Sequence, residues 1–323
     1  MTPAPSLYVV GGQQRAPRSL LEGGDWYGYA RGIVLRVDGD DVTTAASYES
    51  PPGTCAPGDP VLFKSATRRG DRLYACTQTE VVVLGVPGFE VLHHLSLPVF
   101  NDVHHVLPTD RGTVLVANSG LEMVLEVTLD GRVERIWNVL GEDPWERFSP
   151  DVDYRMGVDL KPHRAHPNHV FLVGEEAWVT RFELRDAVCL DDHRRRIVIG
   201  DERVHDGVVH GGLVHFTTVD GTVVVADPET LEVVDRVRLD VPGSSESVTG
   251  WCRGLLVDGD HAWVGYSRIR ATRLRQTVSW VRTGLQRSLP TRIARHRLAD
   301  WSFDGEIDLE PHGLNAVFTI APA

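Results

Sequence analysis

Short runs of hydrophobic residues recur along the whole chain and predict β-strands. The runs are rich in Val, Leu, Ile and Thr, and short turns containing Gly or Asp separate them. Few stretches keep the 3.6-residue apolar period of an amphipathic helix. The pattern therefore favours an all-β protein.

The predicted strands repeat in units of about 40 residues, the period of propeller blades. The clearest unit starts at Val103 and reads VHHVLPTDRGTVLVANSGLEMVLEVTLDGRVERIWNV, which divides into four strands at the turns DRG, NSG and LDG. A second unit starts at His205, and weaker copies start at Val61, His166 and Cys252. Four antiparallel strands at this period are typical of a β-propeller.

The two ends of the chain supply the strands of one further blade. The segment PHGLNAVFTI near the C-terminus would form its innermost strand, followed in space by the N-terminal segments SLYVVGG, GIVLRVDG and VTTAASYE. This closure would cover sheet edges that could otherwise pair with another chain. The sequence thus predicts one six-bladed propeller of four-stranded antiparallel blades, a single domain over residues 1–323.

Three longer segments interrupt the repeat, at residues 13–32, 140–164 and 267–290. If the strands of a blade are lettered a to d outward from the axis, the first and third segments join strands b and c. The second segment joins strand d to the next strand a. Both kinds of connection lie on the rim where every strand a begins, so we expect these loops to cover a binding site at that mouth of the channel.

Composition and charge narrow the choice of partners and location. The formal net charge of −12 argues against nucleic acid, because phosphate backbones require a dominant basic surface. The N-terminus lacks the pattern of a signal peptide and no long apolar run occurs, which predicts a cytoplasmic protein with no membrane partner. Lys occurs only at positions 64 and 161, which we interpret as the composition of a high-GC bacterial genome.

The Arg-rich segment 267–290 predicts a surface element that could take one of three roles. It would be a solvated hairpin or helix, a flap that attracts anions to the channel, or a contact with a protein partner or a second copy of the chain.

Histidine is distributed unevenly and marks the starts of the innermost strands. Six histidines and one arginine fall at or just before these starts: His104, His105, His166, His169, His205, His312 and Arg253. Because these starts meet at the channel mouth, residues distant in sequence would become neighbours there. Acid–base, nucleophilic and metal chemistry all require such convergence, so we predict a small-molecule site at this mouth.

Three segments between Val103 and Gly221 resemble motifs of the arylsulfotransferase type of six-bladed propeller. VHHVLPTDRGTVLVAN is similar to the family's His-His-Asp strand, and HPNHVFLVGEEAWVTRF is similar to its His-x-Asn-Ser-Val strand with a following Ser-x-Arg. VHDGVVHGGLVHFTTVDG is similar to its Gln-His-Asp strand. The segments occur in the family's order, and the chain departs from the motifs at Val106, His169 and Val204.

The resemblance implies transfer of a sulfuryl group between phenols without a nucleotide donor or other cofactor. His205 would be the nucleophile that is transiently sulfated, and four residues would bind and stabilise the sulfuryl group: His104, His166, Asn168 and Arg181. The other residues of the rim would bind substrate: His105, His169, Arg253 and His312.

Two alternatives stay open beside sulfuryl transfer. In the first, His104, His205 and His312 hold a divalent transition metal, because alternate blades of six lie at threefold positions. The reaction would then be that of a lyase, an isomerase or an oxidative enzyme, in the specialised metabolism of a bacterium. In the second, the propeller is a non-enzymatic scaffold that binds a partner through 267–290.

Overall fold

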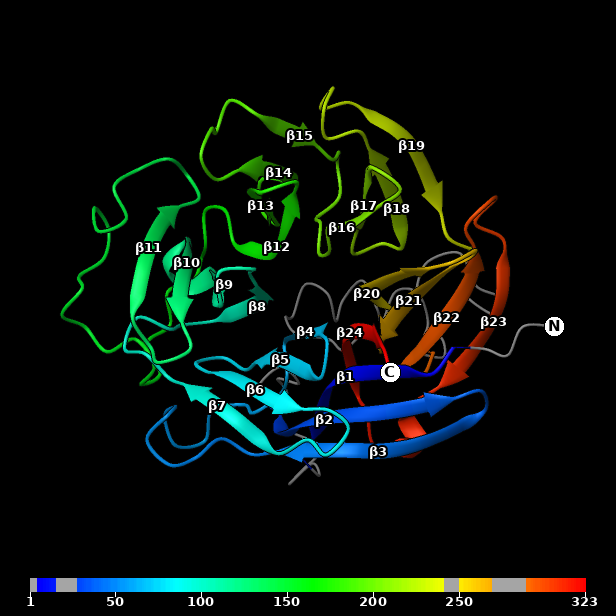
Figure 1. Cartoon of the computed structure of the whole chain (residues 1–323), viewed down its shortest axis with the longest axis horizontal. Coiled ribbons are helices and arrows are strands. Elements are labelled where there is room, and N and C mark those ends of the chain that lie inside the picture. The colour runs from blue at the N-terminus through cyan, green and yellow to red at the C-terminus, as the bar shows by residue number, and fades with distance from the viewer. Residues whose placement is uncertain (1–4, 16–27, 241–249, 269–288) are drawn as a thin grey trace, which may run out of the picture.

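Six four-stranded antiparallel sheets form a closed ring around a central channel (Figure 1). The computed structural model describes residues 5–15, 28–240, 250–268 and 289–323. The predicted six-bladed β-propeller is confirmed. The only helical elements among the described residues are short 3₁₀ turns.

In every blade, four strands follow one another from the channel outward. In that order, blade 1 consists of β24 (Ala316–Pro322), β1 (Leu7–Gln14), β2 (Tyr29–Asp38) and β3 (Asp41–Tyr48). Blade 2 consists of β4 (Ser65–Arg69), β5 (Arg72–Cys76), β6 (Val81–Gly85) and β7 (Val91–Leu95). Blade 3 consists of β8 (Val103–Pro108), β9 (Thr113–Asn118), β10 (Met123–Thr128) and β11 (Val133–Asn138).

The second half of the ring follows the same order. Blade 4 consists of β12 (Pro167–Val173), β13 (Glu176–Arg181), β14 (Asp186–Cys189) and β15 (Arg196–Val198). Blade 5 consists of β16 (Val208–His210), β17 (Leu213–Thr217), β18 (Thr222–Ala226) and β19 (Val233–Arg238). Blade 6 consists of β20 (Trp251–Asp258), β21 (His261–Ser267), β22 (Arg292–Arg297) and β23 (Phe303–Asp308).

The ring closes within blade 1, where the last strand of the chain pairs with the first. Strand β24 runs antiparallel to β1, with Leu7 opposite Pro322 and Val9 opposite Ile320. The Ala323 N–H also donates to the Ser6 carbonyl at 2.8 Å. The predicted closure by the C-terminal strand is therefore correct.

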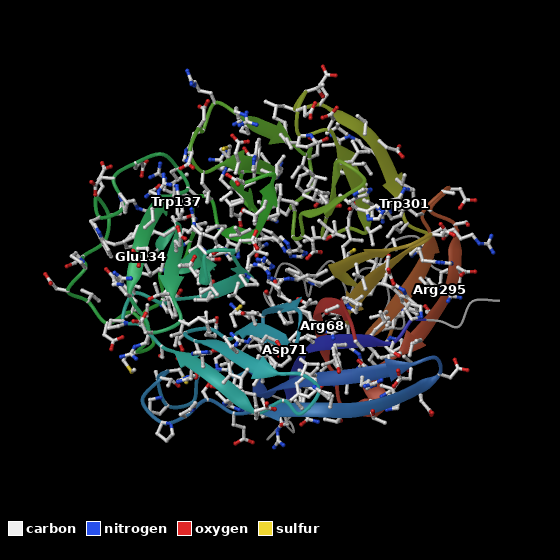
Figure 2. The ribbon with its side chains drawn as sticks, in the orientation of Figure 1. Arg68, Asp71, Glu134, Trp137, Arg295 and Trp301 are labelled. Carbon is white, nitrogen blue, oxygen red and sulfur yellow. The ribbon has the colours of Figure 1, made fainter. Side chains whose placement is uncertain are left out.

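The core lies between neighbouring sheets because successive side chains of a strand point to opposite faces. In blade 3, Val116 and Leu125 pack toward blade 2, whereas Leu115 and Val124 pack toward blade 4. The tryptophans labelled in Figure 2 extend the same packing outward: Trp137 lies in the cluster between blades 3 and 4, and Trp301 in the cluster between blades 5 and 6. Successive side chains of one strand thus pack against the two neighbouring blades in turn.

The predicted loop segments are described in part. Gln14 pairs with Tyr29, so the first connection is shorter than the predicted 13–32, and residues 16–27 lie outside the described part of the chain. Residues 140–164 connect β11 to β12 as expected. Most of 267–290 lies outside the described residues, and its proposed partner contact stays a prediction. None of the helices in the described part could span a membrane.

Candidate functional site

Three residues with metal-binding side chains converge where β8 and β12 begin. The ligand atoms of Asp102, His163 and His166 all lie within 4.8 Å of one another. Asp102 directly precedes β8, and the two histidines precede β12 in the neighbouring blade. The group therefore lies on the predicted rim, although only His166 of the three was expected to take part.

One oxygen of the Asp102 carboxylate has a charged partner, and the other oxygen has none. Its Oδ1 forms an ion pair with Nζ of Lys64, which lies next to β4 in blade 2. The backbone at Asp102 adopts a left-handed conformation, with φ of 52°, and its carbonyl accepts a hydrogen bond from Nδ1 of His104 at 2.7 Å. Its Oδ2 is buried and has no hydrogen-bond partner. A buried oxygen of this kind is costly unless a ligand or ion completes it.

The imidazoles of the group are packed against each other. Nδ1 of His163 lies 2.5 Å from Nδ1 of His166, and the two rings are stacked. The His166 ring also meets the His104 ring edge-on, with 4.5 Å between the ring centroids. The site is thus a compact cluster of one carboxylate and several ring nitrogens.

Glu122 fixes the loop that carries the two histidines. Its carboxylate accepts hydrogen bonds from the backbone N–H groups of Arg164, Ala165 and His166, the last at 2.9 Å. Both Glu122 and His166 have positive φ values, 57° and 55°, which are rare for residues other than glycine. Hydrogen bonds from three successive backbone N–H groups to this one buried carboxylate stabilise the unfavourable backbone conformation of His166 and orient its ring.

Burial determines which groups in the cluster are charged. It lowers the pKa of His163, His166 and His104, so these imidazoles are neutral at neutral pH. Burial would raise the pKa of Asp102, but the positive charges around it, that of Lys64 first, together hold that pKa well below its usual value. Ionised carboxylate and neutral imidazole are the protonation states that metal ions require.

A pocket of ≈ 110 Å³ adjoins this cluster and brings the second lysine to it. Asp102 and His163 line the pocket together with Lys161 and Arg155. The chain has only two lysines, and both lie at this site: Lys64 against Asp102, and Lys161 in the pocket wall. The compositional interpretation of the lysines did not anticipate this placement.

His205 lies one aromatic ring away from the cluster. The Phe182 ring lies 5.3 Å from the His166 ring and 5.2 Å from the His205 ring, and Trp251 stacks beyond His205. Nδ1 of His205 donates to the Cys252 carbonyl at 2.7 Å, so its Nε2 carries the free lone pair. Burial lowers the pKa of His205 to about 3.

Arg253 reaches across the channel from blade 6 to residues of blades 2 and 3. Its guanidinium donates to the carbonyls of Lys64 at 3.1 Å and of His104 at 3.3 Å, and it lies over the Phe318 ring. His105 and His169 line a different pocket, which shares no lining residue with the first. Of the residues predicted to bind substrate, His105 and His169 line this pocket, whereas Arg253 and His312 line neither of the two pockets.

The predicted metal ligands His104, His205 and His312 are not brought together. Within the described residues, their nitrogens do not form a ligand group of the kind that Asp102, His163 and His166 form. His312 is exposed in the 3₁₀ turn Glu310–His312, because the chain turns there through Gly313 before β24 begins at Ala316. Blades 1, 3 and 5 do alternate around the ring, but the turn Glu310–His312 before β24 keeps His312 out of the channel mouth.

Two residues expected to bind a sulfuryl group make other contacts. The amide of Asn168 donates to the Val204 carbonyl at 3.2 Å, between blades 4 and 5, while its Oδ1 is buried without a partner. Arg181 forms a two-pronged ion pair with Asp186 at 2.8 and 2.7 Å and donates to the Val139 carbonyl. With its charge paired, Arg181 has a structural role.

Replacing Arg181 by methionine is expected to lower the free energy of unfolding by about 2–3 kcal/mol, because the buried Asp186 carboxylate keeps only the half-exposed Arg196, at 3.4 Å, as an ionic partner. Urea unfolding measures this loss. The matched control is Arg203→Met, which breaks the exposed pair with Glu183 and should cost at most about 1 kcal/mol. A stable Arg181→Met protein that had lost ligand binding would contradict the structural role.

Comparison with known proteins identifies the fold and nothing finer. No protein-family model and no curated protein sequence matches the chain. A solved protein of unknown function from Bacteroides caccae is similar over 99% of both chains, with a TM-score of 0.63 and 13% identity. A chain in a nidogen/laminin complex is similar over 97% of both chains, with a TM-score of 0.56 and 8% identity. AztD from Citrobacter koseri aligns over 98% of this chain and 97% of its own, at a TM-score of 0.49 and 12% identity.

Proposed function

We propose that the protein binds a divalent transition metal ion through Asp102, His163 and His166 and acts on a small molecule at this mouth of the channel. The observation that carries the proposal is the convergence of three ligand groups around a buried carboxylate oxygen that lacks a partner. A lyase or isomerase reaction is the class that we favour, because a bound metal can act as a Lewis acid in such reactions.

The donor set suits a borderline metal such as Zn²⁺. Imidazole and carboxylate ligands are typical of catalytic zinc and of non-haem iron, and three protein ligands leave positions open for substrate. Lys64 and Glu122 would act behind the ligands, since Lys64 fixes Asp102 and Glu122 fixes the backbone of His166. Such supporting contacts commonly tune both the geometry and the affinity of a metal site.

The surrounding residues supply the other functions that a reaction would need. A bound metal would polarise a substrate oxygen or activate a water molecule. The imidazole of His104 donates from Nδ1 to the Asp102 carbonyl, which leaves the lone pair of Nε2 available as a hydrogen-bond acceptor. Lys161 in the pocket wall offers a positive charge for an anionic group of the substrate.

Titration of metal-free protein with Co²⁺ tests the proposal directly. We expect one equivalent to bind and to produce the visible absorption bands of cobalt with nitrogen and oxygen ligands. Absence of saturable binding by Co²⁺ and by Zn²⁺ would refute the metal site.

Sulfuryl transfer is a second candidate, supported by the state of His205. Its imidazole is neutral, its Nδ1 is fixed on the Cys252 carbonyl, and its free Nε2 is the atom that would attack sulfur. The role that the family resemblance gives to Arg181 is not supported, because that side chain is paired with Asp186.

An aryl sulfate assay separates the two candidates. If sulfuryl transfer is the function, metal-free protein given p-nitrophenyl sulfate and phenol should release nitrophenol, and His205→Ala should reduce the rate at least 100-fold. The variant His261→Ala, altered at a histidine on strand β21, is the control and should keep the full rate. Turnover that is absent without metal, or unchanged in His205→Ala, would count against this candidate.

A further inference from the structure

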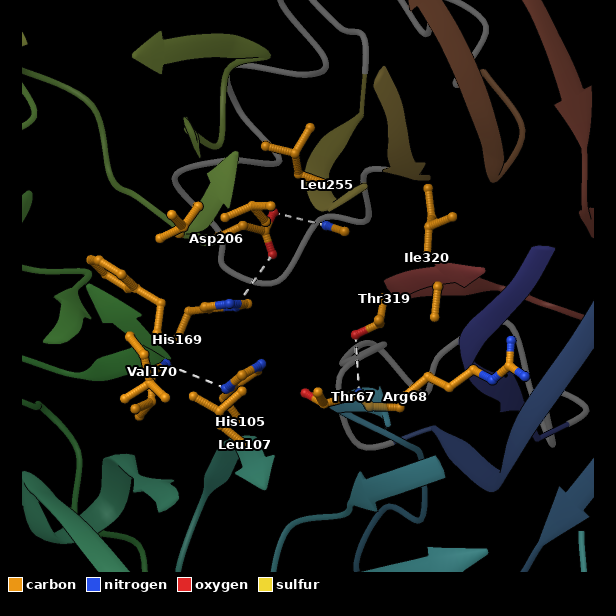
Figure 3. A pocket seen from close by; sticks show the side chains of 18 of the residues that line it. Thr67, Arg68, His105, Leu107, His169, Val170, Asp206, Leu255, Thr319 and Ile320 are labelled. Atoms are coloured by element: carbon orange, nitrogen blue, oxygen red, sulfur yellow. Dashed lines mark hydrogen bonds and ion pairs between the residues drawn. The ribbon is translucent and has the colours of Figure 1, made fainter. Parts of the chain in front are cut away.

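A second pocket, of ≈ 320 Å³, lies in the channel among the innermost strands. The innermost strands of all six blades contribute to its wall, and Figure 3 shows the side chains that line it. None of its lining residues belongs to the pocket beside Asp102. It is therefore a chamber separate from the pocket beside the metal ligands, and two residues that the resemblance assigned to substrate binding, His105 and His169, line it.

Asp206 presents one carboxylate oxygen to this chamber. Its Oδ2 is occupied, because it accepts hydrogen bonds from Oγ1 of Thr217 and from the Gly254 N–H. Its Oδ1 has Nδ1 of His169 as its neighbour at 3.8 Å, which is longer than a hydrogen bond (Figure 3). Asp206 is only 4% exposed, so this oxygen is deeply placed and only partly satisfied.

Two neutral imidazoles lie beside that oxygen. The rings of His105 and His169 are stacked with 3.7 Å between their centroids, and Nδ1 of His105 accepts a hydrogen bond from the Val170 N–H. Burial lowers the pKa of His169 to about 3 and also lowers that of His105, so neither ring carries a charge at neutral pH. The rings thus do not neutralise Asp206.

The nearby arginines are directed elsewhere. Arg253 donates to backbone carbonyls of Lys64 and His104, and no ion pair joins it to Asp206 within the described residues. Arg68 lines the chamber, but its guanidinium donates to the Pro322 carbonyl and points away from Asp206 in Figure 3. Burial raises the pKa of Asp206 although the charge of Arg253 acts against it, and a positively charged ligand in direct contact would offset the cost of burying this carboxylate.

We propose that this chamber binds a small organic cation, whose ammonium group donates to Oδ1 of Asp206 beside the stacked rings of His105 and His169. The apolar part of such a ligand would lie against Val170, Leu255 or Ile320, which line the same wall. Charge-assisted hydrogen bonds to a carboxylate are stronger than neutral ones, and apolar walls strengthen them further. This inference does not depend on the metal proposal.

Three probes of nearly equal shape but different charge test the inference: benzylammonium, benzyl alcohol and benzoate. In calorimetric titrations at pH 7.5 with metal-free protein, we expect benzylammonium to bind with one equivalent per chain. Benzyl alcohol should bind at least tenfold more weakly, and benzoate should not bind. Equal or tighter binding of benzoate or benzyl alcohol would overturn the cation assignment.

Two variants locate the binding. Asp206→Asn keeps an oxygen for the Gly254 N–H but removes the charge, and it should weaken benzylammonium binding at least tenfold. Val209→Trp fills the chamber from a residue that is 42% exposed, so it should abolish binding without disturbing the core. The control Glu126→Gln alters a buried carboxylate outside the chamber and should bind normally. Binding that both Asp206→Asn and Val209→Trp leave unchanged would refute the site.

Discussion

Replacing both His163 and His166 by alanine is expected to reduce the metal content of the protein from one divalent ion per chain to less than about a tenth of that. The double variant removes two of the three ligands, and the remaining carboxylate of Asp102 is already engaged by Lys64. Elemental analysis after equilibrium dialysis against Zn²⁺ measures the loss. Because both side chains lie in a loop rather than in a blade, the fold should survive.

The matched control removes two histidines outside the site, with His210→Ala combined with His261→Ala. These side chains lie on β16 and β21 and belong to no ligand group among the described residues. The control protein should retain a full equivalent of metal. A double variant at 163 and 166 that still held one equivalent would place the metal elsewhere.

Acidification is expected to destabilise the metal-free protein steeply below about pH 6.5. His169 and His205 are buried with pKa values of about 3, whereas the ordinary value is 6.5. Between these values the unfolded chain binds protons that the folded chain does not, so the free energy of unfolding falls as the pH falls. Each histidine contributes about 1.4 kcal/mol per pH unit, or about 4 kcal/mol for the pair between pH 7 and pH 5.

Asp206 opposes part of this trend, because burial raises its pKa and the folded state then takes up a proton before the unfolded state does. Urea unfolding at several pH values measures the sum. The variant His205→Phe, which keeps a ring between Phe182 and Trp251, should lose about 2 kcal/mol less than the wild type over the same range. An equal acid sensitivity in this variant would show that His205 is not the source.

The fold could be predicted because its determinants are local and repeated. Strands such as Val103–Pro108 and Thr113–Asn118 are short runs rich in Val and Leu, and their turns are marked by Gly and Asp. The closure through residues 316–322 also followed, since one blade lacked a strand at one end of the chain and the other end supplied it. Such patterns are visible without any knowledge of contacts.

The site could be predicted only in outline. His104, His166 and His205 lie at starts of neighbouring inner strands, as the blade period required, but Asp102 looked like a turn residue and His163 lay in a loop without a period. Two features of the sequence could have indicated the metal site: the close spacing of the two histidines in His-Arg-Ala-His, and the positions of the two lysines. For Arg181 the motif indicated a position on a strand, but the partner Asp186 depends on how the side chain packs.

The pairing of β24 with β1 has a consequence for how the molecule is made. These strands are separated by about three hundred positions in the chain, so the loop that they close is nearly the whole protein. During synthesis β1, β2 and β3 emerge early, and the edge of β1 stays uncovered until β24 has been made. We therefore expect closure of the ring to be a late step of high contact order, with the edge of β1 uncovered until then.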